Sequence, residues 1–446
     1  MSSQNGSELL RLAPELVENV IKQVNDRREL SNIRLTCKTL DKHAANELFK
    51  DVFVSPEEQH MTSWNSVSQD DVPDIEDHGL GMSRERHEVD EDDDELSSFD
   101  DAIAALSKFP NLTSVEIGFT PECMGRDAEY WQDVPEDASQ REEVLTRIFQ
   151  AIKDRAADEK NRKIRKLTII NLQNCPIPDL TSSELFRDVM AQMEELHISL
   201  VQEYNEHGPD HDYTKVELQT FPAYFCSHWL KPISGNLKAL SIYSQSENWG
   251  PFPGYFDFSA ITFPKLEKLA LGYYTLAHDN DLDWILAIKS LRKLTLHNCM
   301  IASWIRISKE NISEWKFPKH DWTKMPEEEE DSWCENFAYG GKWNQHFDRI
   351  ANELPNLVDF RFGFGSSYRG PPYGVAHRDT CGVEVNPRRY VCFDNGILPT
   401  HWPEAEEDGD MHSWLDDGFP VNKHRENLKA DKESLDALLD ALRSRS

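Results

Sequence analysis

The sequence lacks several features that would each point to a particular class of protein. Its eight cysteines include no Cys-x-x-Cys pair, and zinc sites of the RING or finger type need such close pairs. No run of about 18 apolar residues occurs, so no membrane span is predicted. The first residues, MSSQNGSELL, have no basic start followed by an apolar core. We therefore expect a cytoplasmic or nuclear protein with reduced thiols and no membrane partner.

Positive charge is also scarce, with 48 Lys and Arg against 80 Asp and Glu and a net charge of −32. Phosphate contacts need a basic face, so nucleic acid is not an expected partner. Residues 70–101 are strongly acidic and almost free of apolar side chains, which predicts a disordered insertion. Residues 404–417 are acidic again. Most of this charge is expected to lie in solvated loops and to favour solubility.

Residues 9–49 carry apolar side chains at helical spacing, interrupted by a polar turn over 25–29. This pattern predicts three short amphipathic helices. The apolar positions are Leu12, Leu16, Val20, Ile21, Val24, Leu30, Ile33, Leu35, Ala44, Ala45, Leu48 and Phe49. A unit of about 40 residues buries too little of its own surface to be stable alone, so a partner chain is expected to cover part of it.

The residues of this segment resemble the F-box in the form common in fungal F-box proteins. The shared pattern is Leu12-Ala13-Pro14-Glu15-Leu16, then Ile21, Val24, Leu30 and Ile33 to Lys38. Ala13 stands where the family often has a second proline, and Thr39-Leu40 replaces a frequent Trp. The resemblance implies docking onto the Skp-type adaptor of a cullin-RING ubiquitin ligase. The adaptor-facing positions that it implies are Leu12, Pro14, Glu15, Leu16, Ile21, Leu35 and Cys37. The alternative is an ordinary helical cap on a larger domain.

From residue 106 onward the frame Leu-x-x-Leu-x-Leu recurs, with apolar substitutions. Its members are Leu112-Val115-Ile117, Ile164-Leu167-Ile169, Met193-Leu196-Ile198, Leu237-Leu240-Ile242, Leu266-Leu269-Leu271, Leu291-Leu294-Leu296 and Leu357-Phe360-Phe362. Helix-like stretches lie between frames, over 142–157, 182–193, 281–289 and 344–354. A repeated strand and returning helix resembles the leucine-rich repeat, which implies a curved solenoid with a parallel sheet on its concave side.

The frames are unevenly spaced. The interval from Leu266 to Leu291 fits a repeat of about 20 to 29 residues, whereas that from Leu291 to Leu357 is far longer. A non-repeating α/β fold with parallel strands is therefore the alternative. Residues between the frame leucines are expected to point to solvent and to contact a target protein; they are Thr168, His197, Ser241, Ala270, Thr295 and Arg361.

Two segments near the C-terminus leave alternatives open. Residues 303–343 contain Trp304, Trp315, Trp322, Trp333 and Trp343, and read as an insertion. Its indoles are expected to pack it onto its own domain, with a binding surface as the alternative. Residues 427–445 predict an amphipathic helix that either caps the last repeat or docks a partner.

The expected organisation is an F-box-like helical domain over 1–50, a strand with the acidic insertion over 51–105, irregular leucine-rich repeats over 106–400, and an acidic segment with a terminal helix over 401–446. The whole is an α/β chain. Taken with the resemblance, it predicts a non-catalytic substrate-recognition subunit of an SCF-type ubiquitin ligase that binds the adaptor, through it a cullin, and an unknown target protein. No catalytic residue, cofactor or metal is expected; His207 and His211 are separated by Gly208-Pro209, which breaks any aligning helix. The alternatives are an interaction scaffold outside any ligase, and an enzyme with a site that no motif reveals.

Overall fold

The computed structural model describes a large part of the chain, in segments separated by gaps. These are residues 14–24, 27–34, 36–48, 50–54, 103–104, 106, 109–124, 136–205, 208–209, 216–244, 249–252, 255–314, 319–326, 333–363, 381–394, 399–400 and 423–445. The predicted acidic segments over 70–101 and 404–417 lie outside the described residues. Contacts divide the chain into two compact units, residues 1–118 with 144–168 and residues 119–143 with 169–446.

The first unit contains the three N-terminal helices predicted from the sequence. They are α1 (Pro14–Ile21), α2 (Arg27–Arg34) and α3 (Lys38–Leu48). Val17, Ile21, Leu30 and Ala44 form a small buried cluster of their own. The partly buried side chains packed against this cluster are Val24, Ile33, Leu40 and Leu48. The same unit contains strand β1 (Asp51–Val54), which pairs in parallel with β2 (Ser114–Gly118).

Helix α6 (Ala138–Ala156) begins before the predicted start at residue 142 because of its cap. The Oδ1 atom of Asp137 accepts the N–H groups of Ser139 and Gln140 at 2.7 and 2.8 Å. The Gln140 side chain in turn accepts the Asp137 N–H at 3.0 Å. This reciprocal pair is a capping box, which satisfies N–H groups that a helix start leaves without partners.

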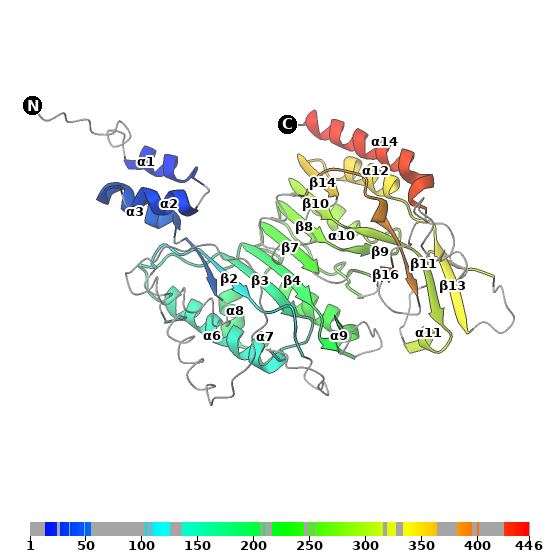
Figure 1. Cartoon of the computed structure of the whole chain (residues 1–446), viewed down its shortest axis with the longest axis horizontal. Helices are drawn as coiled ribbons and strands as arrows, with labels where there is room; N and C mark the ends of the chain where they lie inside the picture. The colour runs from blue at the N-terminus through cyan, green and yellow to red at the C-terminus, as the bar shows by residue number, and fades with distance from the viewer. Residues whose placement is uncertain are drawn as a thin grey trace, which may run out of the picture. The chain divides into compact units, whose positions relative to one another are not determined.

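The second unit is built on a parallel sheet, so the α/β class is confirmed. Hydrogen-bonded neighbours in this sheet follow the order β3 (Lys166–Gln173), β4 (Glu195–Val201), β7 (Ala239–Ser244), β8 (Lys268–Gly272), β10 (Lys293–His297) and β14 (Asp359–Gly363). Figure 1 shows the last five strands side by side. The second frame position of each strand lies opposite its neighbour's, in the row Leu196, Leu240, Leu269, Leu294 and Phe360.

Three of the frames also share a backbone feature late in the strand or just after it. Asn171, Tyr273 and Asn298 have φ of 62°, 60° and 50°, and they stand at the same place after the frame starts Ile164, Leu266 and Leu291. Positive φ is uncommon outside glycine, and Asn tolerates it best. A residue in the left-handed region thus recurs at the same position of three frames.

Helices connect the strands at four of the places predicted. They are α6, α8 (Glu184–Met190), α10 (Asp283–Leu286) and α12 (Trp343–Glu353). Not predicted were α7 (Pro178–Thr181), and α9 (Val216–Tyr224) running into the π-helix η3 (Phe225–Leu230). Pro222 lies inside α9, and a proline removes a donor from the helical ladder.

A second sheet occupies the region that reads as a tryptophan-rich insertion. Its order is β12 (Trp322–Lys324), β13 (Cys334–Tyr339), β11 (Met300–Ser308), β15 (Tyr390–Asp394) and β16 (Pro399–Thr400), with β9 (Thr275–Leu276) also paired to β11. Smaller elements are the hairpin β5 (Tyr204–Asn205) and β6 (Gly208–Pro209), α11 (Asn311–Glu314) and the turn η4 (Pro387–Arg389). The region predicted as an insertion is therefore folded into strands of a second sheet.

The indoles of this region pack inward, as expected, with one exception. Trp304 and Trp322 are each 8% exposed and Trp343 is fully buried. Trp333 is 58% exposed, and Trp315 lies outside the described residues. The Nε1 of Trp322 donates to Ala277 O at 2.9 Å.

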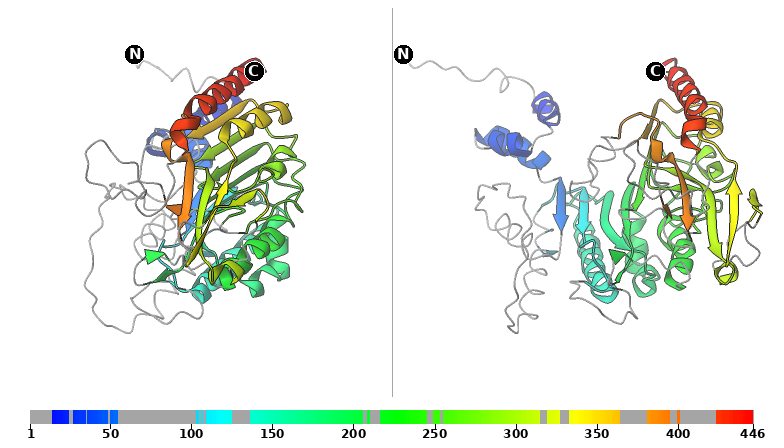
Figure 2. Two further views of the ribbon diagram at one scale, coloured as in Figure 1. Left: turned by 90° about the vertical axis from the view of Figure 1, so that its right-hand side faces the viewer. Right: turned by 45° about the vertical axis from the view of Figure 1, so that its right-hand side comes forward.

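The C-terminal helix α14 (His424–Arg443) lies alongside α12 (Figures 1 and 2). It buries Leu435, Leu438 and Leu442. Arg445 beyond its end donates to the carbonyls of Ala351 and Leu354 at 2.6 and 2.9 Å. The helix thus packs against its own unit, and its predicted role as a cap of the last repeat or as a partner-docking helix stays a prediction. No helix among the described residues is both long and apolar enough to cross a membrane.

Candidate docking surface and polar clusters

Helix α1 presents an apolar pair to the outside. Leu16 is 51% exposed and Val20 is 47% exposed. Residues four apart on a helix share a face, so the two side chains form one patch. Val17 and Ile21, on the other side of α1, are each 2% exposed. The helix therefore uses one apolar face for its own core and leaves a second uncovered.

The other residues predicted to face an adaptor are placed as follows. Pro14 and Glu15 form the start of α1, and Cys37 is a half-buried free thiol. Leu12 and Leu35 lie outside the described residues. The prediction that Ile21 faces the adaptor is wrong. Ile21 packs into the cluster with Leu30 and Ala44 and is almost completely buried.

The residues predicted to face a target form one row across the sheet of the second unit. His197, Ser241, Ala270, Thr295 and Arg361 lie opposite one another on neighbouring strands. Their expected exposure is wrong from one end to the middle of the row, where His197, Ser241 and Ala270 are 7%, 3% and 7% exposed. Thr168, in β3, is also only 3% exposed. At the other end, Thr295 and the side chain of Arg361 are half-buried.

Polar contacts follow this row from strand to strand. The Nδ1 of His197 lies 3.0 Å from Ser241 Oγ, and its Nε2 lies 3.6 Å from the Glu195 carboxylate. Towards the other end, Asp359 lies between two cations, 3.6 Å from Arg361 Nε and 3.4 Å from Lys293 Nζ. Exposed pairs of this kind contribute little to stability.

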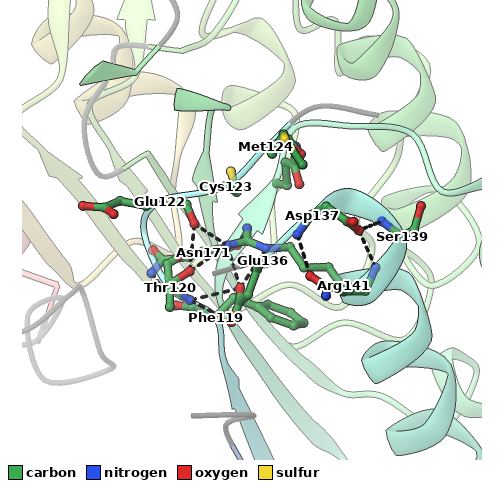
Figure 3. Close-up of polar contacts among 12 residues, drawn as sticks. Phe119, Thr120, Glu122, Cys123, Met124, Glu136, Asp137, Ser139, Arg141 and Asn171 are labelled. Atoms are coloured by element: carbon green, nitrogen blue, oxygen red, sulfur yellow. Dashed lines mark hydrogen bonds and ion pairs between the residues drawn. The ribbon is translucent and has the colours of Figure 1, made fainter. Parts of the chain in front are cut away.

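Arg141, near the start of α6, is a buried cation that no sequence pattern predicted (Figure 3). Its Nε donates to Glu136 at 2.9 Å. Its Nη1 donates to Asn171 O at 2.9 Å and its Nη2 to Thr120 O at 2.7 Å. The guanidinium also lies over the Phe119 ring, 5.1 Å from its centre. Every nitrogen of Arg141 thus has a protein partner, which makes this a structural clasp.

Burial shifts the pKa values of two groups at this clasp. Burial raises the pKa of Glu136, against the opposing effect of Arg141. Burial also raises the pKa of Cys123 to about 12, so that cysteine is a thiol near neutral pH and not a nucleophile. Its Sγ donates to Gln202 O at 3.3 Å.

A second unpredicted cluster joins His278 to His320 and Asp321. One potential ligand atom from each of the three lies within 4.8 Å of the others. The two imidazoles stack with centres 3.7 Å apart, and Asp321 Oδ2 lies 3.6 Å from His278 Nδ1. His278 follows β9 and the other two residues immediately precede β12, so no local sequence pattern announces the group.

The His278 ring is the unusual member. Its side chain is only 4% exposed, and within the described part of the chain neither ring nitrogen makes a hydrogen bond, Asp321 lying just beyond that distance at 3.6 Å. Leaving a buried polar group in that state costs about 1 to 3 kcal/mol. Burial lowers the pKa of His278, with a smaller contribution from His320, so the ring is neutral near neutral pH. A neutral imidazole has a lone pair to offer.

The chain matches no protein-family model and no curated protein sequence.

Proposed function

We propose that this protein is the non-catalytic substrate-recognition subunit of an SCF-type ubiquitin ligase. In this role the F-box-like helices bind a Skp-type adaptor and through it a cullin, and the repeat-like sheet binds a target protein. The contribution to rate is proximity and orientation of the target, with no chemistry by side chains of this chain.

The observation that carries the proposal is the uncovered patch of Leu16 and Val20 on α1. The three helices have an apolar cluster of their own and nevertheless leave these two large side chains about half exposed. Leu16 directly follows Pro14 and Glu15, where the resemblance to the F-box puts the adaptor, and Val20 lies one helical turn later. Large exposed apolar side chains that lie together are typical of a protein interface.

The target-binding half of the proposal rests on the half-buried end of the strand row. Thr295 and Arg361 are accessible there, whereas His197 and Ser241 are buried and support the surface from within. The leucine-rich repeat solenoid stays a proposal as well. The aligned frames and the recurring left-handed residue favour it, and the second sheet is an addition to it.

The test is capture of the adaptor by the full-length protein and by the double variant Leu16→Asp with Val20→Asp. Full burial of one Leu or Val side chain contributes about 1.5 to 3 kcal/mol. Leu16 and Val20 are each about half exposed, so covering both contributes roughly the same amount in total. Losing it raises the Kd about 10-fold to 100-fold. The matched control is Leu428→Asp on α14, at a leucine that is 45% exposed, and it is expected to leave binding unchanged.

Unchanged adaptor capture by the double variant, with helix content preserved in circular dichroism, contradicts the docking assignment. A complex that contains the adaptor but excludes cullin favours an interaction scaffold outside the ligase. Capture from cells with blocked proteasomes, probed for adaptor, cullin and stabilised proteins, separates these two outcomes.

A further inference from the structure

We propose that His278, His320 and Asp321 form a binding site for a divalent transition-metal ion of the zinc type. This site is independent of the proposed receptor function, because the three residues belong to the second unit and take no part in the helical docking patch. The argument rests on how the backbone holds the residues, on the chemistry of the donors and on the unsatisfied ring of His278.

The backbone on both sides of the cluster is fixed by hydrogen bonds. Asp281 Oδ2 accepts the N–H of Ala277 at 2.5 Å and that of His278 at 2.7 Å, which closes the loop around His278. Asp321 Oδ2 accepts the N–H of Asp279 at 3.2 Å. The Trp322 indole donates back to Ala277 O. Two chain segments far apart in the sequence are thus tied together where the donors converge.

The side chains around the donors favour a cation. Asp279 belongs to the same loop, and its carboxylate accepts the hydroxyl of Tyr339 at 2.8 Å. A guanidinium that contacts this loop is that of Arg349, which donates to the Asp279 carbonyl at 3.1 Å and to Asp283 Oδ1 at 2.7 Å. Arg349 therefore pairs with Asp283, and the carboxylate of Asp321 lies near the two histidines.

The donor set selects the class of metal. Two imidazole nitrogens and one carboxylate oxygen suit zinc and neighbouring first-row ions, whereas calcium and magnesium prefer oxygen ligands throughout. Three protein ligands leave a fourth position for water or for a group from a partner.

Binding requires a limited rearrangement. Imidazole lone pairs lie in the ring plane, and the rings of His278 and His320 are stacked at only 13°. One ring must therefore turn for both nitrogens to reach the same ion at about 2.0 to 2.1 Å. His320 and Asp321 are exposed, whereas the side chain of His278 is buried, so the two surface residues have more room to move. The buried ring is the fixed ligand and the two surface residues close onto it.

The experiment uses the full-length protein without an affinity tag, stripped of metal by chelator and titrated with ZnCl2 in a calorimeter. CoCl2 serves as a spectroscopic stand-in whose visible absorption reports nitrogen and oxygen ligation. We expect one equivalent to bind, and the Tm to rise with zinc. The variants His320→Ala and Asp321→Asn alter exposed residues and are expected to weaken binding at least about tenfold and to remove most of the Tm rise. Asn is chosen at 321 because it tolerates the φ of 67° found there.

The matched control is His228→Ala, a half-buried histidine outside the cluster that stacks on Tyr224. It is expected to bind zinc as the unmodified chain does. The proposal is overturned if no saturable zinc binding occurs, if both cluster variants bind like the unmodified protein, or if the control loses as much affinity as they do. Adaptor capture repeated in chelator is expected to be unchanged, so failure of this site and failure of the receptor function are distinguishable.

Discussion

Replacing Asp431 by Ala is expected to destabilise the second unit severely, because this carboxylate is the buried connection between α14 and the rest of the fold. Asp431 and Arg389 form an ion pair at 2.8 Å with both side chains fully buried. The same carboxylate accepts the Tyr390 hydroxyl at 3.0 Å and the Asn344 N–H at 2.9 Å. Arg389 keeps two further partners, the carbonyls of Asn386 and His424.

The magnitude follows from what the substitution leaves behind. Removing one partner of a buried ion pair costs about 3 to 5 kcal/mol, because the remaining charge stays buried and uncompensated. The lost hydrogen bonds to the carboxylate are part of this figure, since bonds to a charged group are worth about 1.5 to 3 kcal/mol each. We expect a loss near 4 kcal/mol, with α14 detaching from α12 as the first consequence.

The assay is urea unfolding followed by circular dichroism and by tryptophan fluorescence, since Trp343 begins α12 beside the pair. Asp436→Ala on the exposed side of the same helix is the matched control, with an expected change below about 0.5 kcal/mol. The apolar pair Arg389→Met with Asp431→Leu is expected to recover much of the loss, because it removes both charges. A loss under about 1 kcal/mol for Asp431→Ala would refute the reasoning.

Two further perturbations test the parallel sheet and the loop around His278. Burial raises the pKa of Asp281 to about 7 from an ordinary value of 3.8. The protonated Asp281 side chain therefore stabilises the fold fully below pH 4, and this stabilisation is lost as the pH rises towards 7. The total loss is at most about 4 kcal/mol. Asp281→Asn is expected to flatten this decline in denaturation midpoints between pH 4 and 8, and an unchanged slope would contradict the buried-acid explanation. At Gly272, an added Cβ would lie 2.0 Å from the Tyr243 ring, so Gly272→Ala is expected to cost at least about 1 to 3 kcal/mol in urea unfolding. Gly235→Ala, with nothing within 4 Å of its Cβ, is the control, and equal midpoints for the two variants would exclude the steric argument.

The strand register could be predicted from the sequence because it depends on local spacing. Each frame puts apolar side chains on one face, and a slip by one residue would expose them all, so Leu240, Leu269 and Leu294 had to align. The helix starts were less accurate. Asp137 was not recognised as a cap, although its spacing from Gln140 is the signal that could have identified it.

What the sequence could not provide depends on distant contacts. Whether His197 and Ser241 are buried depends on what packs against the sheet, whereas the strand pattern predicts only the face on which they lie. The segment that contains Trp304 and Trp322 is predicted as an insertion because its hydrophobic strands follow no repeat frame. The pairing of His278 with His320 joins segments far apart in the chain, and only three-dimensional proximity reveals it.

The alignment of the frames has a consequence for how such a chain can change over generations. Since each row of the sheet is set by the few residues inside a frame, the connectors between Leu271 and Leu294 or between Leu296 and Phe360 can lengthen or shorten without shifting any row. The second sheet is an example of material accommodated in this way. Residues can therefore be added to or removed from the connectors while the parallel strands keep their register. Shortening the longest connector is a rational starting point for building a minimal form of this protein.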